Sequence, residues 1–246
     1  MSRSAGSGAL RALILQHEEP TPPGHVTEWL GGHGAEMDVL RIDVEDPRVD
    51  PGRYDLIVSL GSEFAAYDDS HRFVTSEAEL MRRAVDADVP ILGLCFGGQM
   101  LARVLGGEVY RGSESEIGWL PVRTRDPDLV PEGPWFQWHF DVITAPPDST
   151  VLAETDLGTQ AFVAGRSLGL QFHPEVTTEI MEDWVRTYRH ELDGDGVDPD
   201  ALLEETRRRA AESRRMALQL LERFWSDVAR LPAGERSEPR GDRRAG

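Results

Sequence analysis

Apolar runs alternate with segments of helical spacing along the first part of the chain. Continuous apolar runs of this length are typical of buried strands, and apolar residues at helical intervals are typical of amphipathic helices. An alternation of strands and helices predicts an α/β fold with an open, mainly parallel sheet flanked by helices. The predicted strands are 11–16, 37–42, 54–60 and 89–94, and the predicted helices are 22–33, 71–87 and 99–105.

The pattern changes after residue 108. Residues 108–172 contain short apolar stretches broken by glycine and proline, without helical spacing, which predicts antiparallel strands. A helix over 181–192 is predicted to close the domain. The predicted organisation is a disordered leader over 1–9, a domain over 10–192, a polar linker over 193–200, a C-terminal amphipathic helix over 201–231 and a disordered tail over 232–246.

The C-terminal helix repeats apolar residues such as Leu220 and Phe224 at helical intervals, opposite a row of arginines. Two interpretations stay open from the sequence. The helix docks on its own domain, or it offers a surface to a partner protein or to a second protomer of a homodimer.

Composition excludes several classes of function. The net charge of −18 argues against nucleic acid and anionic membrane as partners. All 26 basic residues are arginine, so neither a lysine-bearing phosphate loop nor Schiff-base chemistry is expected. The histidines and the single cysteine lack zinc-ligand spacing, so we expect no metal and no cofactor. Residues 9–15 resemble neither a signal peptide nor a membrane span, and one cysteine allows no internal disulfide, which together favour a cytoplasmic protein.

Cys95 lies where a predicted strand runs into a predicted helix. Glycines two residues before and after it, Gly93 and Gly97, produce the pattern Gly-x-Cys-x-Gly. This is the cysteine form of the nucleophile elbow, a sharp turn whose strained central residue needs neighbours without a Cβ atom. The N–H groups at the start of the following helix favour a thiolate. The pattern therefore predicts a cysteine nucleophile.

His173 and Glu175 come directly after another apolar run, over 167–172. In an extended chain these two side chains project from the same face, and Pro174 between them restricts the backbone. A cysteine nucleophile needs a base, and the base needs a third group that orients it. We therefore expect His173 to be the base and Glu175 its orienting group.

With these two motifs, 93–99 and 169–175, the chain resembles the class I (triad-type) glutamine amidotransferases, and within them the glutaminase domain of GMP synthetase and its free-standing relatives. The resemblance covers about 10–190 and implies a flavodoxin-like sheet. It also implies a catalytic triad of Cys95, His173 and Glu175, with Gln99 beside the bound glutamine.

The resemblance implies an oxyanion hole as well. Its donors are the backbone N–H of Phe96 and one from the loop after an earlier strand, here Gly61-Ser62-Glu63, which departs from the family's Gly-Gly-Pro pattern. The donor in that loop would be the Ser62 N–H, and Gly61 would contact the substrate.

A third family feature, a Ser-His-Gly-Asp-like stretch around the substrate, is matched at 136–141 only by His139 and Asp141. We therefore expect Trp138, Phe140 and Asp141 near the substrate. His139, with Asp141 two residues on, is the rival of His173 as base.

The function that the resemblance implies is hydrolysis of the side-chain amide of L-glutamine through a γ-glutamyl thioester. The ammonia would pass to a separate synthetase, since no lysine-bearing ATP site is present in the sequence. Two alternatives stay open. The protein is a γ-glutamyl hydrolase acting on other γ-glutamyl amides or peptides, or it is a non-catalytic binding module.

Overall fold

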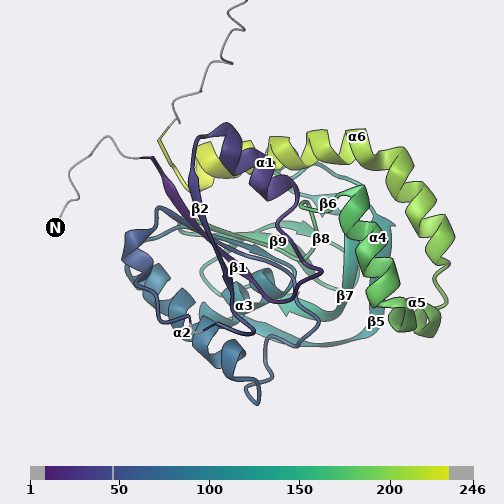
Figure 1. Cartoon of the computed structure of the whole chain (residues 1–246), viewed down its shortest axis with the longest axis horizontal. Coiled ribbons are helices and arrows are strands. Elements are labelled where there is room, and N and C mark those ends of the chain that lie inside the picture. The colour runs from purple at the N-terminus through teal and green to yellow at the C-terminus, as the bar shows by residue number, and fades with distance from the viewer. Residues whose placement is uncertain (1–8, 46, 233–246) are drawn as a thin grey trace, which may run out of the picture.

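Ten strands build one mixed sheet in the part of the chain that the structure describes, and helices cover both faces of the sheet (Figure 1). The structure is a computed structural model, and it describes residues 9–45 and 47–232. Residues 1–8 of the predicted leader and 233–246 of the predicted tail lie outside the described residues.

The elements follow the order that the hydrophobic pattern predicts. The strands are β1 Arg11–Gln16, β2 Glu36–Arg41, β3 Leu56–Ser59, β4 Ile91–Leu94, β5 Glu108–Leu120, β6 Arg123–Thr124, β7 Trp135–Thr144, β8 Thr150–Glu154, β9 Thr159–Ala164 and β10 Ser167–Leu170. The helices are α1 His25–Gly32, α2 Arg72–Asp86, α3 Phe96–Val104, α4 Thr178–Thr187, α5 Arg189–Asp195 and α6 Pro199–Arg223, with a 3₁₀ turn at Pro51–Arg53 and a π-helical turn at Phe224–Val228.

The sheet order is β2-β1-β3-β4-β10-β9-β7-β5, with β8 paired to β9 and to β6. Neighbours from β2 to β10 are parallel, and neighbours from β10 to β5 are antiparallel. The predicted α/β sheet is confirmed, and the residues after 108 supply its antiparallel part as predicted. Because β10 pairs in parallel with β4, Leu170 lies beside Leu94 and the residues after both strands leave the same edge of the sheet. That edge carries the candidate site.

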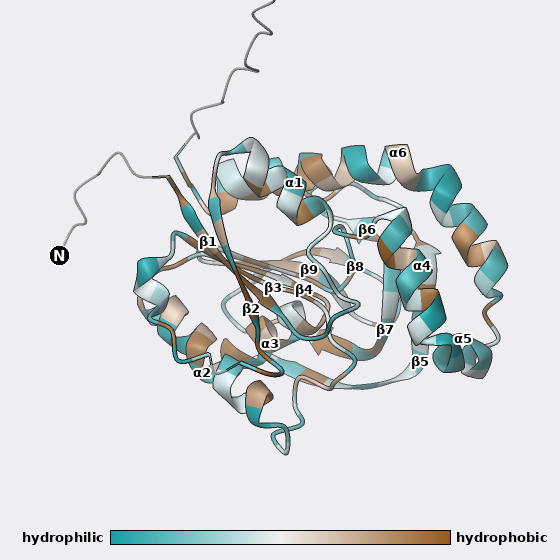
Figure 2. Ribbon diagram, in the orientation of Figure 1, coloured by the Kyte–Doolittle hydropathy of each residue, from teal (hydrophilic) through white to brown (hydrophobic). Residues whose placement is uncertain are grey.

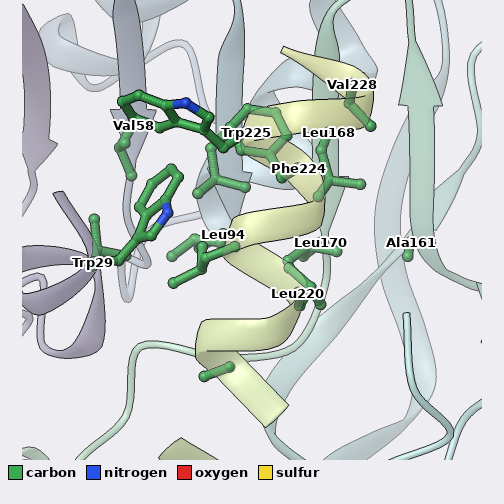
Figure 3. Packing of buried hydrophobic residues seen from close by; sticks show 14 of the residues in the cluster. Trp29, Val58, Leu94, Ala161, Leu168, Leu170, Leu220, Phe224, Trp225 and Val228 are labelled. Carbon is green, nitrogen blue, oxygen red and sulfur yellow. The ribbon is translucent and has the colours of Figure 1, made fainter. Parts of the chain in front are cut away.

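Two apolar layers hold the helices on the sheet. On one face, Trp29 of α1 and Leu220 of α6 pack on sheet residues such as Leu170 (Figure 3). On the other face, Met81 of α2 and Met100 of α3 are fully buried against the sheet. Figure 2 shows the same division, with hydrophobic strands in the centre and hydrophilic outer surfaces on the helices. Burial of these apolar faces is what orders the helices on the sheet.

The C-terminal helix α6 docks on its own domain. Leu220 and Phe224 are fully buried, as is Leu170 in the strand beneath them. Trp225 of the π-helical turn meets Trp29 edge to face, with 5.6 Å between the ring centroids. Of the two interpretations of this helix, the structure shows the first: the apolar face of α6 packs against its own domain.

None of the helices in the described ranges combines the length and the apolar character that crossing a membrane requires.

The structure differs from the sequence prediction around 181–200. The predicted helix 181–192 is divided between α4 and α5, and α4 begins earlier because the Thr177 side chain accepts a hydrogen bond from the Ile180 N–H. Most of the predicted linker 193–200 is helical. Only 196–198 connect α5 and α6, because Gly196 ends α5 with φ +68° and Asp198 caps α6.

Candidate active site

Cys95 sits in the turn between β4 and α3, as the glycine pattern predicts. Its backbone has φ +50° and ψ −107°, a conformation that side chains with a Cβ atom rarely adopt. The flanking glycines are sterically required. A Cβ atom on Gly93 would lie 2.4 Å from the Gly97 carbonyl oxygen, and one on Gly97 would lie 2.2 Å from the Ser59 carbonyl oxygen. The fold therefore holds a strained cysteine at the start of a helix.

The strain at position 95 leads to a stability prediction. Cys95→Gly and Cys95→Ala both remove the sulfur, but only glycine relieves the positive φ. We expect Cys95→Gly to have a free energy of unfolding about 1 kcal/mol higher than that of Cys95→Ala, the reverse of the order in ordinary structured positions. Urea denaturation of both variants checks this. An alanine variant as stable as the glycine variant would show that the turn is not strained.

His173 reaches the thiol because β10 ends next to β4. The Cys95 N–H donates to the Leu170 carbonyl over 2.8 Å, and the His173 N–H donates to the Phe136 carbonyl over 2.9 Å. Gly61, after β3, lies against both side chains. A Cβ atom on Gly61 would lie 3.0 Å from Cε1 of His173 and 3.8 Å from Cβ of Cys95. The fold thus brings the ends of three parallel strands together around the sulfur.

Glu175 holds the imidazole of His173 in place. The distance from His173 Nδ1 to Glu175 Oε1 is 2.7 Å, and both side chains are at most 4 % exposed. Nε2 of His173 is buried and makes no hydrogen bond of normal geometry within the described residues, which leaves it available to a substrate. Burial alone would lower the pKa of His173, but the charges and hydrogen-bonding groups of Glu175 and Cys95 raise it to about 10. At neutral pH this histidine is therefore an imidazolium beside the Cys95 sulfur.

The rival base, His139, is turned to other partners. Its Nδ1 lies 3.0 Å from the Asp141 carbonyl oxygen, and its Nε2 lies 3.1 Å from Oε2 of Glu116. The carboxylate of Asp141 instead accepts a hydrogen bond from the Tyr67 hydroxyl at 3.2 Å. Glu116 also accepts from the Gln160 amide, so it belongs to a buried polar network that the sequence did not indicate. His139 therefore lines the cavity with Nδ1 bonded to its own strand, and with Nε2 close to Glu116 but without a hydrogen bond within the described residues.

The thiol opens into a cavity at the edge of the sheet. The Cys95 sulfur lies 3.8 Å from the Trp138 carbonyl oxygen and 3.7 Å from the side-chain amide nitrogen of Gln171. The side-chain oxygen of Gln171 accepts a hydrogen bond of 3.3 Å from the side-chain amide of Gln99. Gln171 is a contact of the sulfur that sequence reasoning missed, although it stands inside the motif before His173. The predicted site residues that line the cavity are Gly61, Ser62, Cys95, Gln99, Trp138, Phe140, Asp141 and His173.

Two predicted site residues lie behind the cavity wall. Glu175 is only 2 % exposed and contacts His173. The Phe96 side chain is fully buried in the apolar layer that α2 and α3 form with the sheet, so it does not line the cavity. Phe96 is the first residue of α3, and N–H groups in the first turn of a helix have no acceptor within that helix. The predicted role of Phe96 rests on that N–H.

An aromatic and acidic part of the wall was not indicated by the sequence. Trp184 packs edge to face on the His173 ring, with the ring centroids 4.9 Å apart. Glu191 accepts a hydrogen bond of 2.6 Å from the indole N–H of Trp138. Burial, together with the carboxylates of Glu18, Glu63 and Glu191, raises the pKa of the Tyr188 phenol. The periodicity of 181–192 places these residues on a helix, but it does not show that this helix closes the cavity.

Ser62, which departs from the family pattern, is anchored by its own side chain. The Ser62 hydroxyl donates to Glu18 Oε1 over 2.6 Å and accepts from the Phe64 N–H over 3.2 Å. Among the non-glycine residues of the described ranges, positive φ values occur only at Asp88, Cys95 and Arg230. The loop therefore accommodates serine without backbone strain.

A strained cysteine at a strand-to-helix turn, with a buried histidine–glutamate pair beside it, defines an α/β protein of the nucleophile-elbow class. Comparison with known proteins is more specific. The family model described as "Glutamine amidotransferase class-I" matches residues 26–186, which is more than half of the chain. The chain belongs to the class I glutamine amidotransferase family.

Relatives and solved structures agree with this assignment. The chain is 37 % identical over 151 residues to GMP synthase [glutamine-hydrolyzing] of Thermus thermophilus, covering 53 % of this chain and 28 % of that protein. It is 34 % identical over 136 residues to a protein of Sulfurisphaera tokodaii that is named as one subunit of GMP synthase [glutamine-hydrolyzing], covering 50 % and 68 %. The crystal structure of a glutamine amidotransferase from Thermotoga maritima superposes with a TM-score of 0.81 at 33 % identity, covering 88 % and 98 %. The chain thus spans little more than a quarter of the length of the Thermus protein. The family match and the structural superposition confirm the predicted family and fold.

Proposed function

We propose that the protein hydrolyses the side-chain amide of L-glutamine, with Cys95 as nucleophile and a γ-glutamyl thioester as intermediate. This proposal rests on one observation: the side chains of Cys95 and His173 both lie against Gly61, and Glu175 is hydrogen-bonded to Nδ1 of the His173 imidazole. Membership of the class I glutamine amidotransferase family supports it.

In the first half of the reaction the Cys95 thiolate attacks the carboxamide carbon. Charge develops on the carbonyl oxygen, where the N–H groups of Phe96 and Ser62 would stabilise it. The imidazolium of His173 then gives its Nε2 proton to the departing amide nitrogen, the C–N bond breaks, and ammonia leaves. The product on the enzyme is the thioester between Cys95 and the γ-carbonyl of glutamate.

In the second half, neutral His173 accepts a proton from water as the water oxygen attacks the thioester. The C–S bond breaks, glutamate leaves, and the thiolate–imidazolium pair is restored. Glu175 keeps its hydrogen bond to Nδ1 throughout, so that Nε2 stays directed at the reacting atoms. Each step uses only the side chains and backbone groups of this chain together with water.

The proposal includes a separate acceptor for the ammonia, located with this protein in the cytoplasm. Its support is the likeness to the Sulfurisphaera protein, whose name describes one subunit of a GMP synthase. Joint purification with a synthetase from the native host checks this part.

A substrate panel tests the proposed function. Purified protein is given L-glutamine, γ-glutamyl anilide, γ-glutamyl peptides and asparagine, and ammonia and glutamate are both measured. We expect ammonia and glutamate in equal amounts from glutamine, and attachment of a glutamine-analogue chloroketone to Cys95. Cleavage of the other γ-glutamyl compounds without cleavage of glutamine would instead identify a γ-glutamyl hydrolase. The absence of both cleavage and labelling would indicate a binding module.

A further inference from the structure

Behind the loop 61–63 lies a buried chain of hydrogen bonds that the proposed mechanism does not use. Its centre is His17, just after β1. His17 Nε2 is 2.7 Å from Oε2 of Glu77, and His17 Nδ1 is 3.0 Å from the Gly61 carbonyl oxygen. The Ser59 hydroxyl donates to the other oxygen of Glu77 over 2.6 Å. The side chains of His17, Ser59 and Glu77 are fully buried.

His17 and Glu77 are a polar pair in apolar surroundings. The His17 ring lies among aromatic rings, with centroids 4.6 Å from Phe96 and 5.9 Å from Phe73. Replacing a buried ion pair with well-packed apolar residues is often neutral or stabilising. We therefore look for a role of the His17–Glu77 pair other than stabilising the fold.

The groups around His17 define its charge. Burial alone would lower the pKa of His17, but the Glu77 carboxylate raises it above its ordinary value, with a smaller contribution from Glu18 and the bond to the Gly61 carbonyl. The Gly61 carbonyl can only accept a hydrogen bond, so Nδ1 of His17 carries the proton in that contact, and a second proton on Nε2 lets His17 donate to Glu77 as well. Both acceptors are thus satisfied at once.

The contact with Gly61 has a consequence on the other side of the same peptide. The 61–62 peptide is planar and trans, so its C=O and N–H groups point in opposite directions. His17 holds the Gly61 carbonyl, and the Ser62 hydroxyl is fixed on Glu18. Rotation of this peptide would turn the Ser62 N–H away from its present direction.

We propose that His17, held by Glu77 and Ser59, is a positioning residue that fixes the 61–62 peptide so that the Ser62 N–H serves the oxyanion formed at Cys95. This inference rests on the proposed function. It assigns the polar chain from β3 and α2 to transition-state stabilisation rather than to folding.

The test replaces the buried pair with apolar residues, in the double variant His17→Phe/Glu77→Leu. Since both partners are removed together, no buried charge is left unpaired and the fold is expected to persist. We expect kcat for glutamine to fall by roughly 10²- to 10³-fold, the effect of losing one oxyanion donor, with KM changed less than about threefold. The matched control is His33→Phe/Glu222→Leu, which removes a histidine–carboxylate pair outside the cavity; its kcat should stay within about twofold of wild type.

Two further measurements separate positioning from general damage. Affinity for a γ-glutamyl aldehyde, which forms a tetrahedral adduct with the thiol, should fall by the same factor as kcat/KM. Alkylation of Cys95 by iodoacetamide, which develops no oxyanion at the attacked carbon, should keep its rate. A slower alkylation in step with kcat would show that the thiol itself is disturbed, and would overturn the assignment.

The single variant Glu77→Gln gives an independent readout through pH. Removing the carboxylate lowers the pKa of His17 toward or below its ordinary value, so the imidazolium is lost earlier as pH rises. We expect the kcat of Glu77→Gln to decline at a lower pH than the kcat of wild type, because Glu77 is the main group that raises the pKa of His17. If the double variant hydrolyses glutamine like wild type, His17 has no positioning role. If wild type neither hydrolyses glutamine nor binds the aldehyde, the proposed function falls as well.

Discussion

Cys95→Ser is expected to lower glutamine hydrolysis by at least about 10³-fold, toward the roughly 10⁶-fold loss that removal of a protease nucleophile causes. A serine hydroxyl stays protonated beside the imidazolium of His173, whereas a thiol readily gives up its proton to that histidine. The measurement is steady-state release of ammonia and glutamate under saturating glutamine. Chloroketone labelling should disappear at the same time, because the chain has no second cysteine.

The fold should survive this change. Serine is close to cysteine in size, and the site is 5 % exposed, so the unfolding midpoint should move by only a few degrees. Ser226→Ala, on the exposed face of the C-terminal π-helical turn, serves as a matched control and should leave turnover unchanged. Turnover of Cys95→Ser near that of wild type would remove Cys95 from the mechanism.

The parts of the site that sequence could predict are those with a local signal. The glycines around Cys95 mark a turn in which a Cβ atom has no room, and the structure shows those close approaches at Gly93 and Gly97. The pair His173 and Glu175 is local as well, since two residues of extended chain place both side chains on one face. A continuous apolar run is a local signal too, and from it β1 was predicted with its observed bounds.

The rest of the site depends on contacts between distant segments. Glu77 lies on an amphipathic helix, where a charged residue is normally exposed, yet it is fully buried because His17 and Ser59 meet it there. Glu116 is likewise buried against His139 across two antiparallel strands. Periodicity reports which face of an element is apolar, and a polar residue bonded inside the core does not change that pattern.

Helix boundaries near 181–200 were wrong for a different reason. Capping by Thr177 and Asp198, and the left-handed Gly196, set where the helices begin and end. A polar stretch with two glycines resembles a linker in composition alone. In the structure it contains the end of α5 and the start of α6.

Glu175→Gln is expected to lower kcat by roughly 10²- to 10⁴-fold, the upper value being that of the corresponding change in a serine protease. Glutamine keeps the shape of the side chain but not the charge that holds the imidazolium. Because Glu175 and Cys95 together raise the pKa of His173 to about 10, the variant should also need a lower pH for its remaining activity. The measurement is kcat as a function of pH, with labelling of Cys95 to confirm an intact site.

The same change should alter how stability depends on pH. The folded-state pKa of His173, about 10, lies above its ordinary value of 6.5, so the stabilisation it contributes is complete below pH 6.5 and is lost as pH rises toward 10. In Glu175→Gln this loss should be shallower and should occur at lower pH, as measured by urea unfolding between pH 6 and pH 10. Glu222→Gln, which alters the pair with His33 outside the cavity, should keep the wild-type slope. Identical slopes in wild type and Glu175→Gln would mean that Glu175 does not hold the imidazolium of His173, and would remove it from the triad.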